Sequence, residues 1–289
     1  LQLCECLPFD EDSLFIEPVS RMVQSIGDVY VKSCTNQAEI HCICGNTIVE
    51  ILASKSGATI NGASLGFVKF LLDNGEIRGR PVVLSAVVKA YPEMLTRDSS
   101  LVASFCQLCR DLSLDCKADS RKFSAVLINS YTQGRKRFRM RGGVLDHVAV
   151  AVFSETLYPL LQALLLDGCL EIQLEAVSIF ESLSWDDWQI LLRDSWDPLR
   201  MILNKCHGGE DARVRISSCK TVGEVCTVCL SQNDCEEDFI ATFNEFVCGS
   251  MHEALASENQ SVRSMVGPTA SSRSLARIPH LSSGSFRGR

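Results

Sequence analysis

The chain has 289 residues, of which 46% are hydrophobic and 22% are charged, a composition typical of a folded protein. The formal net charge of −7 argues against a nucleic-acid-binding function for the chain as a whole, because affinity for phosphate comes from clustered Lys and Arg. An uninterrupted apolar run of about 18 residues is absent from the sequence, so a membrane span is not expected.

Two features of the sequence bear on the compartment. The start, LQLCECLPFDEDSLF, contains neither a Met nor a basic segment, so a signal peptide is not expected, and the missing Met suggests a fragment or an incomplete gene model. The fifteen cysteines are dispersed, many of them where Ala or Val would suit an apolar helix face. Because free Cys behaves as a small buried hydrophobe, this pattern indicates a reducing, intracellular location, in the cytoplasm and/or nucleus.

Apolar residues recur mostly at spacings of three and four, which favours helices throughout the chain. Asp119 and Asp211 are expected to be helix N-caps. The expected helices span residues 13–31, 37–54, 63–72, 81–91, 99–112, 119–132, 143–152, 155–166, 170–183, 186–193, 197–206, 212–230, 237–256 and 260–266. Strand-like alternation bounded by hairpin signals is absent from the sequence, so the predicted fold class is all-α.

The second half of the chain contains a repeat. The segments EIQLEAVSIFESL, RVRISSCKTVGEV and SVRSMVG align with Ile172, Val214 and Val262 in equivalent positions, at spacings of 42 and 48 residues. Each segment follows an apolar helix, so the unit is a helical hairpin, and helical repeats of the HEAT and armadillo type recur at about 40–47 residues. Since one hairpin buries its apolar faces only against its neighbours, we expect an α-solenoid of stacked antiparallel hairpins, a HEAT/ARM-like superhelix.

The helix expected over 212–230 has one apolar face. Val214, Val222 and Val225 share an arc with Cys229 and are expected to be buried. Three charged residues lie on the opposite side, namely Arg213, Lys220 and Glu224. Arg215 falls at the edge of the apolar stripe, which is an unusual place for a guanidinium.

The segment DARVRISSCKTVG resembles the second helix of a HEAT repeat, in which an Asp in the hairpin turn is followed six residues later by an Arg. The Val-Arg element of that helix is matched by Arg215 and, in the next copy, by Arg263. Asp167 occupies the turn-acid position of the first copy, six residues before Gln173. We expect an ion pair between Asp167 and Arg215 in adjacent repeats; the alternative is that the stem of Arg215 covers the apolar stripe.

The similarity to the HEAT and armadillo superfamily is clearest over residues 211–266. It stops after Val266, where Gly267-Pro268 ends the helix and a Ser/Arg/Gly-rich tail follows that is expected to be disordered. The predicted organisation is degenerate helical repeats over 1–153, HEAT-like repeats over 154–266, and the tail over 267–289.

The sequence offers few candidates for chemistry. Its two CxxC motifs, Cys106–Cys109 and Cys226–Cys229, lie within apolar helices and far apart, so buried thiols are favoured over a zinc or redox site. The cluster His41-Cys42-Ile43-Cys44 is spread around a helix and does not face one ion. We therefore expect no catalytic residue, no cofactor and no metal site.

Residues 135–141 are the strongest local concentration of charge and are expected to form a loop between helices. The segment consists of Arg135, Lys136, Arg137, Phe138, Arg139, Met140 and Arg141. Three interpretations stay open. They are a solvated loop or one docked on an acidic neighbouring patch, a nuclear-import signal, and a nucleic-acid contact in which Arg meets phosphate and Phe meets a base.

Three tryptophans are clustered in SWDDWQILLRDSWDPL. Trp185, Trp188 and Trp196 are expected to fill the core between two hairpins, and the alternative is that exposed Trp residues anchor a partner.

The function most compatible with these patterns is a non-catalytic scaffold or adaptor that binds protein partners through a helical-repeat groove. The alternatives are an adaptor similar to nuclear-transport receptors, which are also acidic helical solenoids, or a nucleic-acid contact through residues 135–141. Nucleic acid is the less favoured partner and no membrane association is expected. The sequence does not identify the partner, the binding face or the oligomeric state.

Overall fold

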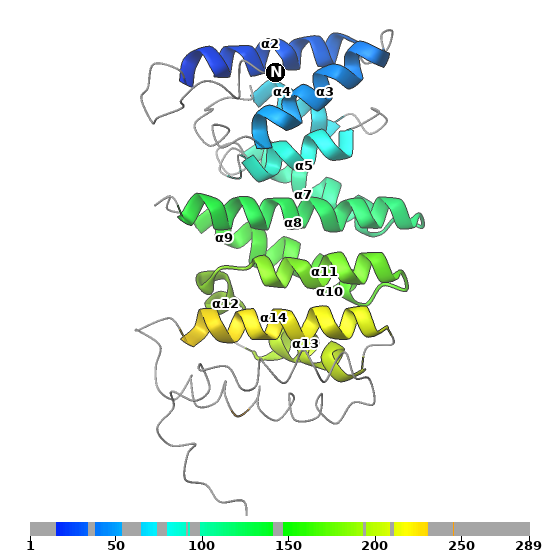
Figure 1. Cartoon of the computed structure of the whole chain (residues 1–289), viewed down its shortest axis with the longest axis vertical. Helices are drawn as coiled ribbons and strands as arrows, with labels where there is room; N and C mark the ends of the chain where they lie inside the picture. The colour runs from blue at the N-terminus through cyan, green and yellow to red at the C-terminus, as the bar shows by residue number, and fades with distance from the viewer. Residues whose placement is uncertain are drawn as a thin grey trace, which may run out of the picture. The chain divides into compact units, whose positions relative to one another are not determined.

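A computed structural model describes residues 16–33, 38–53, 65–73, 80–90, 92, 99–140, 147–192, 195–208, 211–230 and 245 (Figure 1). Every regular element in these ranges is a helix, which confirms the all-α class. The chain divides into two compact units, Leu1–Ala163 and Leu164–Arg289. The helices expected over 237–256 and 260–266, and the tail 267–289, lie outside the described residues.

The helices of the first unit form two layers. Their bounds are α2 (Ile16–Ser33), α3 (Ala38–Ala53), α4 (Leu65–Asp73), α5 (Arg80–Ala90), α7 (Ser99–Ser113), α8 (Ala118–Met140), α9 (His147–Ala151) and the π-helix η2 (Val152–Leu157). One layer contains α2, α4, α7 and η2, each packed on the next, and the other contains α3, α5 and α8. The hairpins α2–α3, α4–α5 and α7–α8 connect the layers, which is the stacked-hairpin arrangement of an α-solenoid.

The second unit follows the same plan. Its helices are α11 (Leu170–Ser182), α12 (Trp185–Leu192), α13 (Asp197–Gly208) and α14 (Ala212–Leu230), and α14 packs on both α11 and α13 (Figure 1). The bounds of α14 are those expected from the sequence. Val214, Val222 and Val225 of its predicted apolar face are buried as expected, whereas the Cys229 side chain lies outside the described residues. Burial of such a Val side chain contributes roughly 1.5–3 kcal/mol.

The segment from His147 to Leu165 is one continuous helical stretch, in which η2 connects α9 to α10 (Tyr158–Leu165). The prediction of two helices separated near residue 153 is therefore wrong. This stretch has 19 residues and is long and apolar enough to cross a membrane. Its side chains Phe153, Leu157 and Leu161 are buried in the structure, as in the core helix of a folded domain.

Gly134 allows α8 to approach the end of α5 closely. A Cβ atom added at Gly134 would lie 2.6 Å from the carbonyl oxygen of Lys89 and 3.1 Å from that of Val88. Contacts this short do not occur for real Cβ atoms, and backbone atoms cannot rotate away as a flexible side chain can. The absence of a side chain at Gly134 therefore sets the distance between these two helices.

Replacing Gly134 with Ala should destabilise the protein by roughly 1–3 kcal/mol, because α8 must move away from α5. The direction of the change in stability is informative, since Ala in a helix interior is otherwise favoured over Gly by about 1 kcal/mol. Urea unfolding followed by circular dichroism measures the change. Gly168→Ala is the control and should be near neutral, because nothing lies within 4 Å of a Cβ added there. A stabilising Gly134→Ala variant would contradict the close contact.

Candidate functional site

The turns before three helices share one polar arrangement. In each turn, an Asp side chain accepts a hydrogen bond from the backbone N–H two residues later, a contact that favours the start of a helix. The pairs, with their N···Oδ1 distances, are Lys117 to Asp115 (2.9 Å) before α8, Cys169 to Asp167 (2.8 Å) before α11, and Arg213 to Asp211 (2.7 Å) before α14. The predicted N-cap at Asp211 is confirmed, whereas Asp119 lies inside α8, and the carboxylate that bonds the turn before this helix belongs to Asp115.

Equivalent side chains follow these turns. The backbone N–H groups of Arg121, Gln173 and Arg215 each donate to the carbonyl four residues earlier at the start of their helix. Nη1 of Arg121 donates to the carbonyl oxygen of Asp115 at 3.0 Å, and Nε2 of Gln173 donates to the carbonyl oxygen of Asp167. In both cases, the side chain at this repeat position donates a hydrogen bond to the backbone of the turn before its helix and so stabilises that turn.

Arg215 is half-buried, with its Nε atom fully buried, at the start of α14. Its charge is one of the causes that lower the pKa of Asp211, after the two hydrogen bonds from Arg213. Arg215 therefore lies within electrostatic reach of the carboxylate of its own turn. The ion pair between Asp167 and Arg215 stays a prediction, and Arg263 lies outside the described residues.

Three positions after Arg121, Gln173 and Arg215, each of these helices has a small residue that faces the interior. Ser124, Ala176 and Ser218 occupy equivalent positions and are fully buried. The copy in α8 was not found from the sequence, because Ser120 replaces the apolar residue that precedes the Arg position elsewhere. The signal that identifies it is Asp115 followed six residues later by Arg121, the same spacing as Asp167 and Gln173.

An ion pair joins α14 to α11 within the second unit. Nζ of Lys220 donates to Oε1 of Glu181, and this contact raises the pKa of Lys220. The hydrogen bond and charge of Asp211 raise the pKa of Arg213, and the charge of Glu171, also in α11, adds to this shift. The sequence showed these cations on the exposed side of α14 but did not identify their partners.

The basic segment is part of a helix, so the prediction of a loop over 135–141 is wrong. α8 continues to Met140, and its contact with α5 at Gly134 explains why this glycine does not end it. Arg137 is exposed, and Lys136, Phe138 and Arg139 are half-buried. Arg141 lies outside the described residues.

Arg135 is buried inside the first unit, with 1% of its surface exposed. Its Cζ atom lies 5.6 Å from the ring centroid of Tyr131 and 5.1 Å from that of Phe153. Both distances fall within the range of cation–π contacts, which are stronger when the cation is desolvated. Arg135 is therefore a core residue and does not belong to the exposed basic surface.

The tryptophans differ in their burial. Trp188 is 1% exposed and lies 5.9 Å, centroid to centroid, from the ring of Phe180 in α11, so the core interpretation holds for it. Trp185 and Trp196 are half-buried. Anchoring of a partner by Trp185 stays a prediction.

Of the candidate metal and redox groups, His41 and Cys109 are buried, while Cys42, Cys44 and Cys106 are half-buried. Burial raises the pKa of the Cys106 and Cys109 thiols, which disfavours the thiolate needed for metal binding or nucleophilic attack. His41 is buried, stacks on Tyr30 with centroids 3.8 Å apart, and its Nδ1 lies 3.0 Å from the Tyr30 carbonyl oxygen. No group of three His, Cys, Asp or Glu side chains in the described ranges could hold a metal ion.

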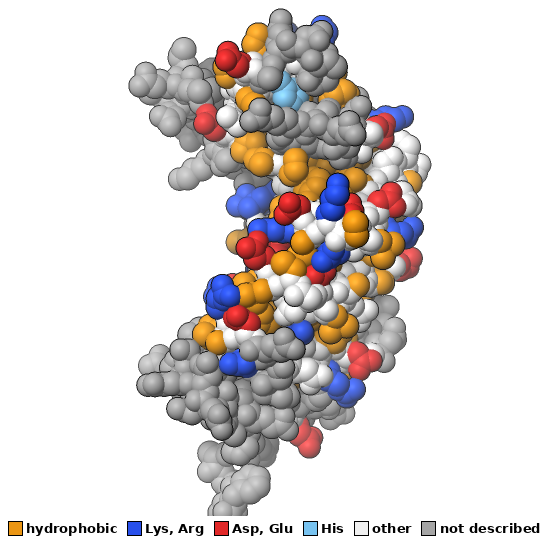
Figure 2. Space-filling view, turned by 90° about the vertical axis from the view of Figure 1, so that its right-hand side faces the viewer, with side chains coloured by type: hydrophobic (Ala, Val, Ile, Leu, Met, Phe, Trp, Pro, Cys, Tyr) orange, Lys and Arg blue, Asp and Glu red, His pale blue; other side chains and the backbone are white. Residues whose placement is uncertain are grey.

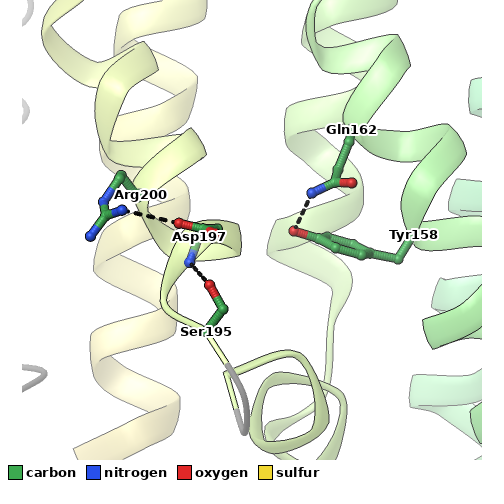
Figure 3. A network of polar contacts seen from close by, with 5 residues as sticks. All are labelled: Tyr158, Gln162, Ser195, Asp197 and Arg200. Carbon is green, nitrogen blue, oxygen red and sulfur yellow. Dashed lines mark hydrogen bonds and ion pairs between the residues drawn. The ribbon is translucent and has the colours of Figure 1, made fainter.

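Three further polar contacts, drawn in Figure 3, are local. Oγ of Ser195 accepts a hydrogen bond from the Asp197 N–H at 3.0 Å, and Asp197 accepts one from Nη1 of Arg200 at 3.0 Å. Separately, Nε2 of Gln162 donates to Oη of Tyr158 at 3.0 Å within α10. The exposed Asp197–Arg200 pair contributes about 0–1 kcal/mol, so these contacts support helices and do not form a site.

The surface drawn in Figure 2 is mixed in character. Acidic and basic side chains are interspersed with apolar ones over the described residues of this face. Among the described residues of this face, charges of both signs are mixed and no single sign covers an extended area.

These features define a helical-repeat protein with Asp side chains bonded within its hairpin turns and a largely apolar interior that also holds buried polar residues such as Arg135. No protein-family model matches the chain, and no curated protein sequence is similar to it. Solved structures are similar in fold. An engineered protein, structural-genomics target OR329, aligns with a TM-score of 0.55 and 13% identity over 87% of this chain and 95% of its own.

Designed armadillo repeat proteins are also similar. One, solved in complex with the peptide (KR)4, aligns with a TM-score of 0.55 and 12% identity over 86% of this chain and 99% of its own. A second aligns with a TM-score of 0.51 and 14% identity over 89% of this chain and 99% of its own. The chain is therefore an all-α solenoid of the armadillo-like helical-repeat type.

The equivalent serines provide a matched test of the repeat. Oγ of Ser124 donates to the Cys109 carbonyl oxygen at 2.8 Å, whereas the buried Oγ of Ser218 makes no hydrogen bond to the described residues. Ser124→Ala should cost about 1 kcal/mol, while Ser218→Ala should be neutral or stabilising by up to about 1 kcal/mol. Urea unfolding measures both changes. Equal destabilisation by the two variants would contradict the assignment.

The cap at Asp211 should be sensitive to acid. The hydrogen bonds from the side chain and the N–H of Arg213 lower the pKa of Asp211 below its ordinary value of 3.8. This contribution to stability is present above pH 3.8 and is lost as the pH falls through the lowered folded-state pKa. The melting temperature of the unchanged protein should exceed that of Asp211→Asn at neutral pH, and the two should converge in acid. A gap that does not change with pH would contradict this.

Proposed function

We propose that the protein is a non-catalytic scaffold or adaptor that binds protein partners through its helical-repeat surface. The observation that carries the proposal is the similarity in fold to designed armadillo repeat proteins, one of which was solved with a bound peptide. Stacked hairpins present a large ordered surface without the need for a catalytic centre. The transfer of peptide binding to this chain is an inference from fold.

The finer assignment is to the HEAT branch of the helical repeats. Residues 211–266 resemble HEAT repeat-containing protein 6 in the patterns VRISSCKTVGEVCTVCL, DFIATFNEF and NQSVRS. We assign the protein to the interior of the cell, in the cytoplasm and/or nucleus. The free thiols support this location, since the cysteines whose side chains are described are not paired in disulfides.

The alternative of nucleic-acid binding through residues 135–141 loses one of its main contacts. Arg135 is buried against two aromatic rings and does not reach a phosphate without rearrangement of the core. An adaptor similar to nuclear-transport receptors is a special case of the proposed scaffold and differs in the identity of its partner.

The proposal predicts saturable binding of a protein partner to the folded chain. Affinity capture with the tagged full-length chain, followed by cross-linking and mass spectrometry, identifies candidates, and calorimetry with purified components measures each interaction. A designed armadillo repeat protein of similar length is the control for non-specific capture. Failure of every captured protein to bind in the purified system would overturn the scaffold proposal.

A further inference from the structure

Positive charge is concentrated on one pair of packed helices in this acidic chain. α5 and α8 pack on one another within the first unit. Only one acidic residue, Asp119, belongs to the pair. The basic residues of the pair are Arg80, Lys89, Arg121, Lys122, Arg135, Lys136, Arg137 and Arg139. The net charge of the whole chain is −7, so these helices are strongly positive against an acidic background.

The contact at Gly134 brings two of these cations together. The Lys89 carbonyl lies against the backbone of α8 at Gly134, and Arg137 follows Gly134 by three residues, on the same side of the helix. Burial of Lys89 lowers the pKa of its ammonium group, and the nearby charge of Arg137 lowers it further. Two cations therefore lie close together at the surface where α8 ends, with the guanidinium of Arg137 exposed.

The arrangement favours an anionic ligand. Holding two like charges together is unfavourable in the free protein, and a carboxylate between them would turn repulsion into two charge-assisted hydrogen bonds. Lys136 and Arg139 lie about 100° and about 160° around α8 from Arg137, so they belong to other faces of the helix and are not part of this surface. The close backbone contact between Gly134 and the Lys89 carbonyl, and not a flexible loop, sets the spacing of Lys89 and Arg137.

We infer that the surface formed by Lys89 and Arg137 binds an acidic, Asp/Glu-rich segment of a protein partner. This inference rests on the proposed scaffold function and specifies the chemistry of one partner. The surface spans only about two helical turns, or roughly 10 Å, which suits a few carboxylates on a short segment. A nucleic acid would extend beyond it onto an acidic chain, and Arg135 is unavailable to hold it.

The test uses the full-length chain and a short fluorescein-labelled peptide of alternating Glu and Ser, followed by fluorescence anisotropy. The unchanged protein should bind, with affinity that falls as salt is added. The double variant Lys89→Gln/Arg137→Gln should weaken binding by about tenfold or more, since two charge-assisted contacts are lost. Arg110→Gln/Arg200→Gln is the matched control, because it changes two exposed cations outside the surface and alters the net charge equally.

Thermal unfolding of both variants establishes that they remain folded before binding is compared. Equal weakening by the two double variants, or no binding of the Glu/Ser peptide to the folded protein, would overturn the inference. Tighter binding of a labelled single-stranded RNA that depends on Lys89 and Arg137 would overturn it in favour of nucleic acid. If captured partners bind the Lys89→Gln/Arg137→Gln variant as they bind the unchanged protein, this inference fails while the scaffold proposal stands.

Discussion

Close packing between the second helices of neighbouring hairpins is the constraint on which the structure depends. In the first unit, α5 and α8 meet at a point where only hydrogen fits between the Gly134 Cα and the Lys89 carbonyl. In the second unit, α11 and α14 pack on one another, and each contributes a small buried residue at the same repeat position, Ala176 and Ser218. Interiors of this density tolerate little change in volume, so such positions limit the sequence more than the exposed faces do.

Much of the local structure could be predicted from the spacing of apolar residues. The bounds of α14 and its buried face followed from the positions of Val214, Val222 and Val225, because one amphipathic helix carries its own periodic signal. The end of α8 could not be predicted in this way. Gly134 followed by a run of cations is typical of a loop, and only the contact with α5 shows that the glycine serves packing between helices. Tertiary contacts therefore overrode local preference there.

The candidate surfaces were predictable in kind but not in detail. Residues 135–141 were recognised as basic, yet the helix divides them between the core, where Arg135 lies on Tyr131 and Phe153, and the surface, where Arg137 lies. Lys89 is distant in sequence and carries no motif, so its place beside Arg137 required the fold. Hydrogen bonding in the turns shows a similar limit, since sequence placed Gln173 at the repeat position but did not identify the Asp167 carbonyl as its acceptor.

The π-helical segment η2 has a consequence for how this chain tolerates insertions. A π-bulge holds one residue more than the α-helix would in the same turn, without breaking the rod. The residues after Leu157 are therefore shifted by about one residue, or about 100°, from the phase that an uninterrupted α-helix would give them in the sequence. Loss of a single residue between Val152 and Leu157 would restore ordinary α-helical winding and leave Leu161 in the interior that it now occupies. In an α-helix without such a wide turn, the loss of one residue would instead turn every following side chain by about 100°.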